Sequence, residues 1–226
     1  MNNAKEKKEV VINCREFLKV SLIVLMVVSV ILITWGIPQL CSYGASHFPS
    51  VGVDDLIPLV TEFVWIYYFT FPLGIFSIYV LYFKNRNAMW DIVITFIIAC
   101  FISMVFYFVY PTEMIKPPLD PVSVSDKLTI MTWNASRPVC CLPSQHCFMA
   151  LSCIFASIFE KNTCWVIRVL TAIFGVLILC STVLIKQHYI LDFVASFCII
   201  VPIFLILRLI RYFHNKKKEK QEKTNS

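Results

Sequence analysis

Charged residues are scarce in this chain of 226 residues: Asp, Glu, Lys and Arg make up 15% of it, whereas a soluble globular domain carries about 25%. Hydrophobic residues make up 58%, and the mean hydropathy is +0.75. A protein with water on all sides is therefore excluded. The sequence also lacks an internal repeat, which argues against a transporter built from inverted repeats.

The sequence contains ten cysteines but no C-x-x-C pair. Five of the ten cysteines lie in apolar runs, where Cys behaves as a small hydrophobe: Cys100, Cys147, Cys153, Cys180 and Cys198. We therefore expect no metal site. Three further cysteines fall in segments expected to lie outside the cell, where one disulfide could form: Cys41, Cys140 and Cys141.

Apolar runs define the predicted membrane spans. Five are long enough, or nearly so, to cross about 30 Å of hydrocarbon at 1.5 Å per helical residue, and a sixth follows from topology. They lie near residues 17–37, 57–83, 92–110, 144–159, 165–185 and 189–210, the fourth being the shortest and polar at its start. The sequence therefore predicts an all-α polytopic membrane protein, a bundle of six transmembrane helices.

The distribution of Lys and Arg predicts the orientation. With both termini in the cytoplasm, only four basic residues remain outside: Lys116, Lys127, Arg137 and Lys186. This imbalance fits the positive-inside rule, so the net charge of +6 indicates orientation and not a nucleic acid partner. We expect a cytoplasmic segment over 1–16, a transmembrane domain over 17–210 and a basic cytoplasmic tail over 211–226. Aromatic residues near the span ends, Tyr67 among them, are typical of an interfacial belt.

Ionisable residues beside a span are candidates for function, because burying them is costly. Asp192 follows His188 by four residues, one helical turn along the same face, so its carboxylate can accept a hydrogen bond from one ring nitrogen. That bond fixes the tautomer and raises the basicity of the other nitrogen, which produces a base or a nucleophile. A buried polar pair without catalytic function fits the same spacing.

A second histidine lies at the start of the fourth predicted span, in the sequence Pro143-Ser144-Gln145-His146. Ser144 is a good helix N-cap, and the backbone N–H groups that follow it favour an anion. An interfacial histidine without a function is the alternative for His146 taken alone.

The predicted topology brings these features to one side of the membrane. His146 and His188 open two helices at the outer face, and Lys116, Arg137 and Lys186 lie close to them in sequence or at the mouth of the same loop. Two histidines, a carboxylate, a helix N-terminus and three cations favour phosphoryl transfer. In this scheme one histidine attacks phosphorus, the other protonates the leaving oxygen, and no metal is needed.

These residues carry a resemblance to a known family. The segments 143–146 and 181–192 resemble the second and third signature motifs of the type 2 phosphatidic acid phosphatase superfamily, Pro-Ser-x-His and Ser-Arg-x5-His-x3-Asp. The resemblance covers roughly residues 57–196. It implies that His188 forms a phosphohistidine, that His146 is the general acid and that Asp192 orients the nucleophile. It also implies that Ser144 and Ser181 line the phosphate pocket.

The sequence departs from the family pattern in two motifs. Thr182 stands where the third motif has arginine, and the first motif, Lys-x6-Arg-Pro, is not intact. Residues 110–117 are similar to a Tyr-Pro-Thr-x3-Arg-Pro variant of small bacterial members, with Lys116 in place of arginine. That branch also tends to carry Lys-Gln-His before the third-motif aspartate, as in 186–188, which implies a phosphate-binding Lys186. Arg137 precedes a proline, as the arginine of the first motif does.

The resemblance implies an integral membrane lipid phosphatase without a cofactor. It would hydrolyse a lipid phosphomonoester or diphosphate through a phosphohistidine on the extracytoplasmic side. Residue usage suggests a bacterial cell membrane. One alternative is a lipid phosphotransferase like the sphingomyelin and inositol phosphorylceramide synthases, and another is a degenerate member that binds lipid without turnover. Membrane lipids are the expected partners, and the oligomeric state stays open.

Overall fold

The computed structural model describes residues 14–41, 47–135 and 140–224, and within these ranges every regular element is a helix. The prediction of an all-α fold is thus confirmed. Along the chain the elements are α1 (Cys14–Cys41), the short 3-10 helices η1 (Asp54–Leu56) and η2 (Thr61–Phe63), α2 (Val64–Tyr68), α3 (Thr70–Lys84), α4 (Arg86–Val109), α5 (Val124–Ala135), α6 (Gln145–Phe159), α7 (Trp165–Leu184) and α8 (Ile190–Thr224).

Five helical segments of the described chain are long and apolar enough to cross a membrane: Cys14–Cys41, Thr61–Lys84, Arg86–Val109, Trp165–Leu184 and Ile190–Glu222. The segment predicted as the fourth span is α6, which has 15 residues and is about 22 Å long. It is apolar but shorter than the hydrocarbon layer. The count of six spans and the cytoplasmic location of the termini stay predictions.

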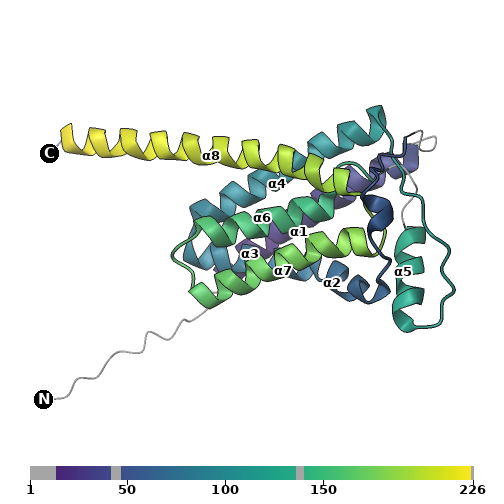
Figure 1. Cartoon of the computed structure of the whole chain (residues 1–226). Helices are drawn as coiled ribbons and strands as arrows, with labels where there is room; N and C mark the ends of the chain where they lie inside the picture. Colours follow the sequence, from purple (N-terminus) through teal and green to yellow (C-terminus); the bar gives the residue numbers. More distant parts are fainter. Residues whose placement is uncertain (1–13, 42–46, 136–139, 225–226) are drawn as a thin grey trace, which may run out of the picture.

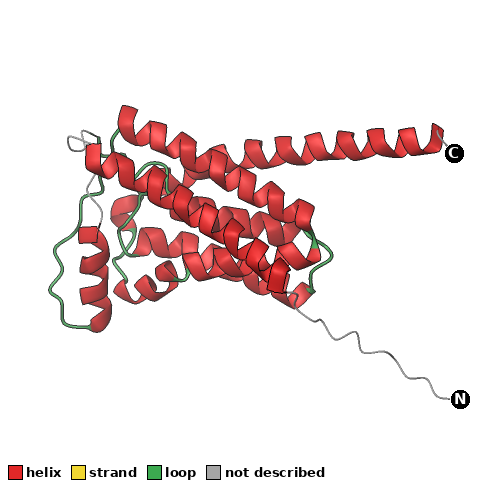
Figure 2. Ribbon diagram, turned by 180° about the vertical axis from the view of Figure 1, so that it is seen from behind, coloured by secondary structure: helices red, strands yellow, loops and turns green. Residues whose placement is uncertain are grey.

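The long helices lie side by side in one bundle, and both described ends of the chain lie at the same end of it (Figures 1 and 2). Helix α5 lies at the opposite end. Helix α8 extends past the other helices and continues without a break across residue 210. An ion pair between Arg211 and Asp91 of α4 holds it there, so the predicted domain boundary at 210 is not a break in secondary structure.

Helix α6 is the centre of the bundle. It packs against α3, α4, α7 and α8, most extensively against α7. Small residues allow these helices to approach closely, as is common in membrane bundles. A Cβ atom on Gly175 of α7 would lie 2.6 Å from the side chain of Ile154 and 3.2 Å from the carbonyl of Ala150, both in α6. One on Gly74 of α3 would lie 2.5 Å from the sulfur of Met149.

The N-terminus of α6 is also tied to its neighbours by polar side chains. The amide of Gln145 donates to the hydroxyls of Thr34 in α1, at 2.9 Å, and Ser103 in α4, at 3.2 Å. The hydroxyl of Ser196 in α8 accepts from the backbone N–H of Ser144 at 3.1 Å. These bonds fix the depth at which α6 begins relative to α8.

The long connection between α4 and α6 contains helix α5, which the sequence analysis did not predict. Its start is a reciprocal cap: Asp126 Oδ2 accepts from Ser123 N, and Ser123 Oγ accepts from Asp126 N. A hydrogen bond from Thr61 and those from Ser123 lower the pKa of Asp126 to about 2. Asp126 therefore stays ionised and anchors α5 to η2.

The close contact at Gly175 gives a stability prediction. Gly175→Ala should force α7 away from α6, because the new methyl group meets Ile154 and a backbone carbonyl, at a cost of about 1–3 kcal/mol. Gly36→Ala in α1 is the matched control, since its Cβ would meet nothing within 4 Å. Thermal unfolding in detergent should give a lower midpoint for Gly175→Ala. Equal midpoints for the two variants would contradict this packing.

Candidate active site

His188 and Asp192 are in contact. His188 lies two residues before the start of α8, and its Nδ1 is 2.9 Å from Oδ2 of Asp192, in the first turn of that helix. The same oxygen accepts the backbone N–H of Tyr189 at 3.1 Å. Both side chains are buried, Asp192 completely. The hydrogen bond expected from the four-residue spacing is therefore present, across the turn that leads into the helix.

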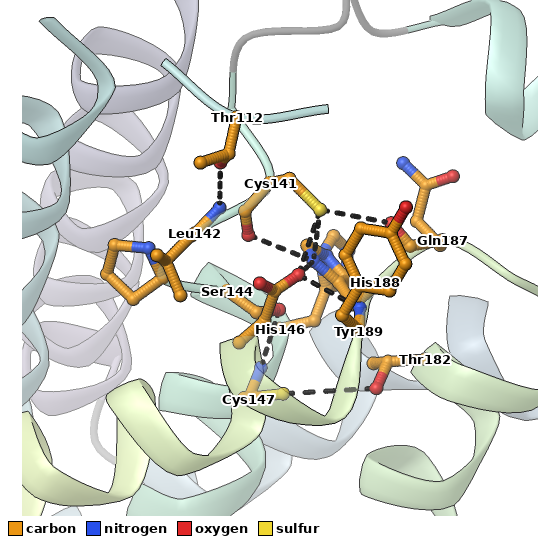
Figure 3. A network of polar contacts seen from close by, with 12 residues as sticks. Thr112, Cys141, Leu142, Ser144, His146, Cys147, Thr182, Gln187, His188 and Tyr189 are labelled. Carbon is orange, nitrogen blue, oxygen red and sulfur yellow. Dashed lines mark hydrogen bonds and ion pairs between the residues drawn. The ribbon is translucent and has the colours of Figure 1, made fainter. Parts of the chain in front are cut away.

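The loop before α6 covers this pair from the other side (Figure 3). The carbonyl oxygen of Cys141 lies 3.0 Å from Nδ1 of His188, and its thiol lies 2.8 Å from Oδ2 of Asp192. Burial and the nearby carboxylate raise the pKa of the Cys141 thiol well above its usual range. The thiol is thus a neutral hydrogen-bond donor, and all ten cysteines are free, so the disulfide considered from the sequence is not formed.

His146 faces the pair from α6. Ser144 is the N-cap of this helix, as predicted, and its side chain accepts the N–H of Cys147 at 3.3 Å. Nδ1 of His146 lies 3.2 Å from the hydroxyl of Tyr67 in α2, and the two rings are stacked. Tyr67 is buried, so it does not belong to the interfacial belt in which its position near a span end had placed it.

The two histidine rings share one cavity. Their centroids are 6.1 Å apart, and both line a space of about 240 Å³. Gln187, Tyr67 and Thr132 add polar atoms to its wall, while the remainder is mostly apolar and includes residues of α1, α3, α4 and α6. A small charged group can therefore lie between the rings with an apolar group beside it.

Lys116 supplies a cation behind this wall. Its ammonium group donates to the carbonyl of Lys186 at 2.8 Å and to Oε1 of Gln187 at 3.2 Å. It also lies 5.8 Å from the ring centre of Trp133, in α5. Burial lowers the pKa of Lys116 from 10.5 to about 8, although the Cys141 and Asp192 positions partly oppose the shift. Lys116 is thus a cation at neutral pH, and a bound anion would stabilise its charge.

Lys186, for which the resemblance implied a phosphate-binding role, does not line the histidine cavity. Its backbone has a left-handed φ of 52°, and its ammonium group donates to the carbonyl of Asp54 at 2.7 Å. It lines a different cavity, with Asp55 and Tyr189. The two backbone N–H groups after it, of Gln187 and His188, both bind the carbonyl of Thr182. This turn positions His188 and directs Lys186 the other way.

The remaining predicted ligands use their polar groups locally. Ser181 and Thr182 are buried in the last turns of α7 and donate to the carbonyls of Ile178 and Leu179. Ser144 is fully buried as the cap of α6. Thr182, where the family motif has arginine, therefore supplies a backbone acceptor to the His188 turn rather than a phosphate clamp. Arg137 lies outside the described residues.

Cys141, His188 and Asp192 also bring metal-ligand atoms within 4.8 Å of one another. Around a tetrahedral zinc ion such atoms lie roughly 3.5 Å apart. Here the thiol and Nδ1 are each within 2.9 Å of Asp192 Oδ2, which is the spacing of direct hydrogen bonds. The arrangement therefore matches a hydrogen-bonded network.

Comparison with known proteins decides the family. A family model described as the PAP2 superfamily matches residues 46–206, which is more than half of the chain and includes His146, His188 and Asp192. The chain belongs to the PAP2 superfamily. No curated protein and no solved structure matches it. Membership in the PAP2 superfamily and the long apolar helices together indicate an integral membrane protein with a phosphatase-like function on lipids.

Sequence reasoning missed Cys141 and Tyr67, which contact the PAP2 histidines directly. Neither has a local signal. Cys141 lies 47 positions before His188, and Tyr67 lies 79 positions before His146. Only the proximity of Cys141 to the Pro-Ser-x-His motif, two residues before Pro143, pointed to its location.

The burial of Lys116 gives a prediction that can be tested without an enzymatic assay. Its amine should lose its charge as the pH rises through about 8, because burial destabilises the cation. Binding of a phosphate by this cation should weaken over the same range. Competitive acetylation followed by mass spectrometry measures the midpoint, with the exposed Lys217 as the reference amine. If Lys116 titrates together with Lys217, the described burial is wrong.

Proposed function

We propose that this PAP2 protein is a metal-independent lipid phosphate phosphatase that works through a phosphohistidine. The observation that carries the proposal is the cavity shared by His188 and His146, with the Nδ1 of His188 engaged by two acceptors. Because Nδ1 must donate to the Cys141 carbonyl, the lone pair of neutral His188 is on Nε2. That atom is the nucleophile.

The first step transfers the phosphoryl group to the protein. Nε2 of His188 attacks phosphorus, and the bond between phosphorus and the lipid oxygen breaks with its electron pair left on that oxygen. The protonated ring of His146 gives its proton to the leaving oxygen. Asp192 stabilises the positive charge that develops on His188. Tyr67, at 3.2 Å, holds the His146 ring in place.

The second step releases phosphate. A water molecule attacks the phosphohistidine and gives a proton to His146, which now acts as the base. The bond between phosphorus and Nε2 breaks, and its electron pair returns to His188. Lys116 and the N-terminus of α6 stabilise the charge on the non-bridging oxygens. Arg137, Ser144, Ser181 and Lys186 were also assigned to phosphate from the family pattern. Among the described cations of this set, Lys116 lies behind the cavity wall, where it donates to the lining residue Gln187.

An apolar space continues from the histidine cavity and supports a lipid substrate. A second cavity of about 310 Å³ lies between α1, α3 and α6, and it shares Ile31, Leu32, Phe71 and Met149 with the first. Its other lining residues are all aliphatic. A phosphate between the histidines can therefore be joined to a hydrocarbon chain that lies against α1 and α3.

Helices α6 and α8, which begin next to the two histidines, both begin at the end of the bundle opposite the described chain ends (Figure 1). With the termini in the cytoplasm, as the positive-inside rule predicts, the site opens on the extracytoplasmic side of the membrane. We propose a bacterial cell membrane on residue usage. The substrate then reaches the site from the outer leaflet, with its phosphate at the level where α6 and α8 begin.

The direct test is phosphate release by the purified protein in detergent micelles with EDTA present, over a panel of lipid phosphates. Wild type should release phosphate, and His188→Ala should lose at least about a thousandfold in kcat, because it lacks the nucleophile. His214→Ala, in the exposed end of α8, is the matched histidine control and should retain activity.

Other outcomes would point elsewhere. Release that His188→Ala retains, or that EDTA abolishes, would contradict the proposal. Transfer of phosphate to an added alcohol without release to water would indicate a lipid phosphotransferase. A folded protein that binds lipid phosphates and turns over none of them would be a degenerate binder.

The apolar cavity predicts dependence on chain length. Ile75 lines only the second cavity, so Ile75→Trp should raise KM for a long-chain lipid phosphate roughly tenfold and leave KM for a short-chain one unchanged. Ile94→Trp on α4 is the control, because Ile94 is exposed to a similar extent and does not line the cavity. If wild type and Ile75→Trp have equal KM values for the long-chain lipid phosphate, the hydrocarbon chain of the substrate does not occupy this cavity.

A further inference from the structure

Cys141 is the described residue that contacts both members of the His188–Asp192 pair from outside their own segment. Its carbonyl oxygen is 3.0 Å from His188 Nδ1, and its sulfur is 2.8 Å from Asp192 Oδ2. Only 6% of the side chain is exposed. Figure 3 shows both contacts converging from the loop that precedes α6. The mechanism above uses the carbonyl, but it does not use the thiol.

The backbone of this loop is held firmly enough to aim both groups. The N–H of Cys141 donates to the carbonyl of Thr112 at 3.3 Å, and the N–H of Leu142 donates to the hydroxyl of Thr112 at 2.8 Å. The hydroxyl of Tyr107 in α4 donates to the carbonyl of Pro143 at 2.6 Å. The loop that carries the thiol is therefore held by α4 and the segment after it, in addition to its contacts with α8.

The carboxylate of Asp192 depends on few donors. All its hydrogen bonds go to Oδ2, from Nδ1 of His188, the N–H of Tyr189 and the thiol of Cys141. Oδ1 is buried and has no partner among the described residues. The thiol is thus one of three donors that hold a fully buried carboxylate, and the only one that comes from outside the 188–192 segment.

We propose that Cys141 is a positioning residue for the nucleophile: its carbonyl selects the His188 tautomer, and its thiol holds and partly neutralises the Asp192 carboxylate. This inference rests on the proposed function, in which Nε2 of His188 attacks phosphorus. The chemistry is a neutral S–H group donating to a carboxylate. The thiol is neither a nucleophile nor a ligand in this scheme.

Removal of the thiol should change the pH at which neutral His188 forms, and the direction of that change follows from the charge on Asp192. With one donor fewer, Asp192 carries more negative charge toward His188 and stabilises the imidazolium, so neutral His188 forms only at higher pH. The other groups around His188 stay in place in such a variant. They are His146 on α6, Tyr67 on α2, Tyr107 on α4, Lys116 in the loop after α4, and Tyr189 beside the turn.

The experiment compares Cys141→Ala, Cys141→Ser and wild type by the pH dependence of kcat and by the pH dependence of His188 carbethoxylation, read by mass spectrometry. Cys141→Ala should lower kcat about tenfold at neutral pH, which is the loss of one hydrogen bond to a charged group. It should also move the acid limb of both profiles to higher pH. Cys141→Ser keeps a donor and should restore both toward wild type.

A second buried cysteine provides the control for packing. Cys153 in α6 is 1% exposed and does not contact the histidines, so Cys153→Ala removes the same atom and should leave both profiles unchanged. If Cys141→Ala behaves like Cys153→Ala, or if Cys141→Ser fails to restore the acid limb in a folded protein, the proposal is wrong. A shifted modification profile in a protein that hydrolyses no lipid phosphate would support the positioning role and reject the proposed function.

Discussion

One carboxylate oxygen, Oδ2 of Asp192, joins the parts of the chain that form the site. It accepts hydrogen bonds from the turn before α8, through His188 and Tyr189, and from the loop before α6, through Cys141. Because a fully buried carboxylate is very costly without such donors, α8, the turn before it and the loop before α6 hold one another in place. The orientation of the His188 ring follows from this contact, since its Nδ1 has no freedom to turn away.

The second histidine depends on helix packing rather than on charge. His146 is placed by the depth of α6, which Gln145 and Ser196 fix against α1, α4 and α8. The close approach at Gly175 then sets the distance between α6 and α7, whose last turn supports the His188 turn through the carbonyl of Thr182. Rigid helices thus hold the two rings 6.1 Å apart, which leaves room for a phosphoryl group between them.

Local periodicity predicted much of this arrangement. The all-α fold, the contact between His188 and Asp192 and the Ser144 cap all follow from spacings of a few residues, which the backbone geometry fixes. Helix α5 has a local signal as well, in Ser123 followed by Asp126 three residues later. It was not predicted because it lies in a long loop without an apolar run.

The remainder depends on contacts that no local pattern carries. The left-handed backbone at Lys186 reverses the direction of its side chain. A helical pattern in the sequence does not predict such a backbone conformation. The thiol of Cys141 contacts Asp192, and the hydroxyl of Tyr67 contacts His146, although these residues lie far apart in the sequence. A motif therefore identified the histidines, whereas the groups that orient them came from the tertiary structure.

The most direct test of the account is the identity of the phosphorylated residue during turnover. Wild type mixed with a lipid phosphate labelled in its phosphoryl group is quenched in alkali, which preserves phosphohistidine, and its peptides are mapped by mass spectrometry. The account predicts label on Nε2 of His188 and nowhere else. Label on another residue, or steady turnover with no labelled residue at the shortest times, would contradict it.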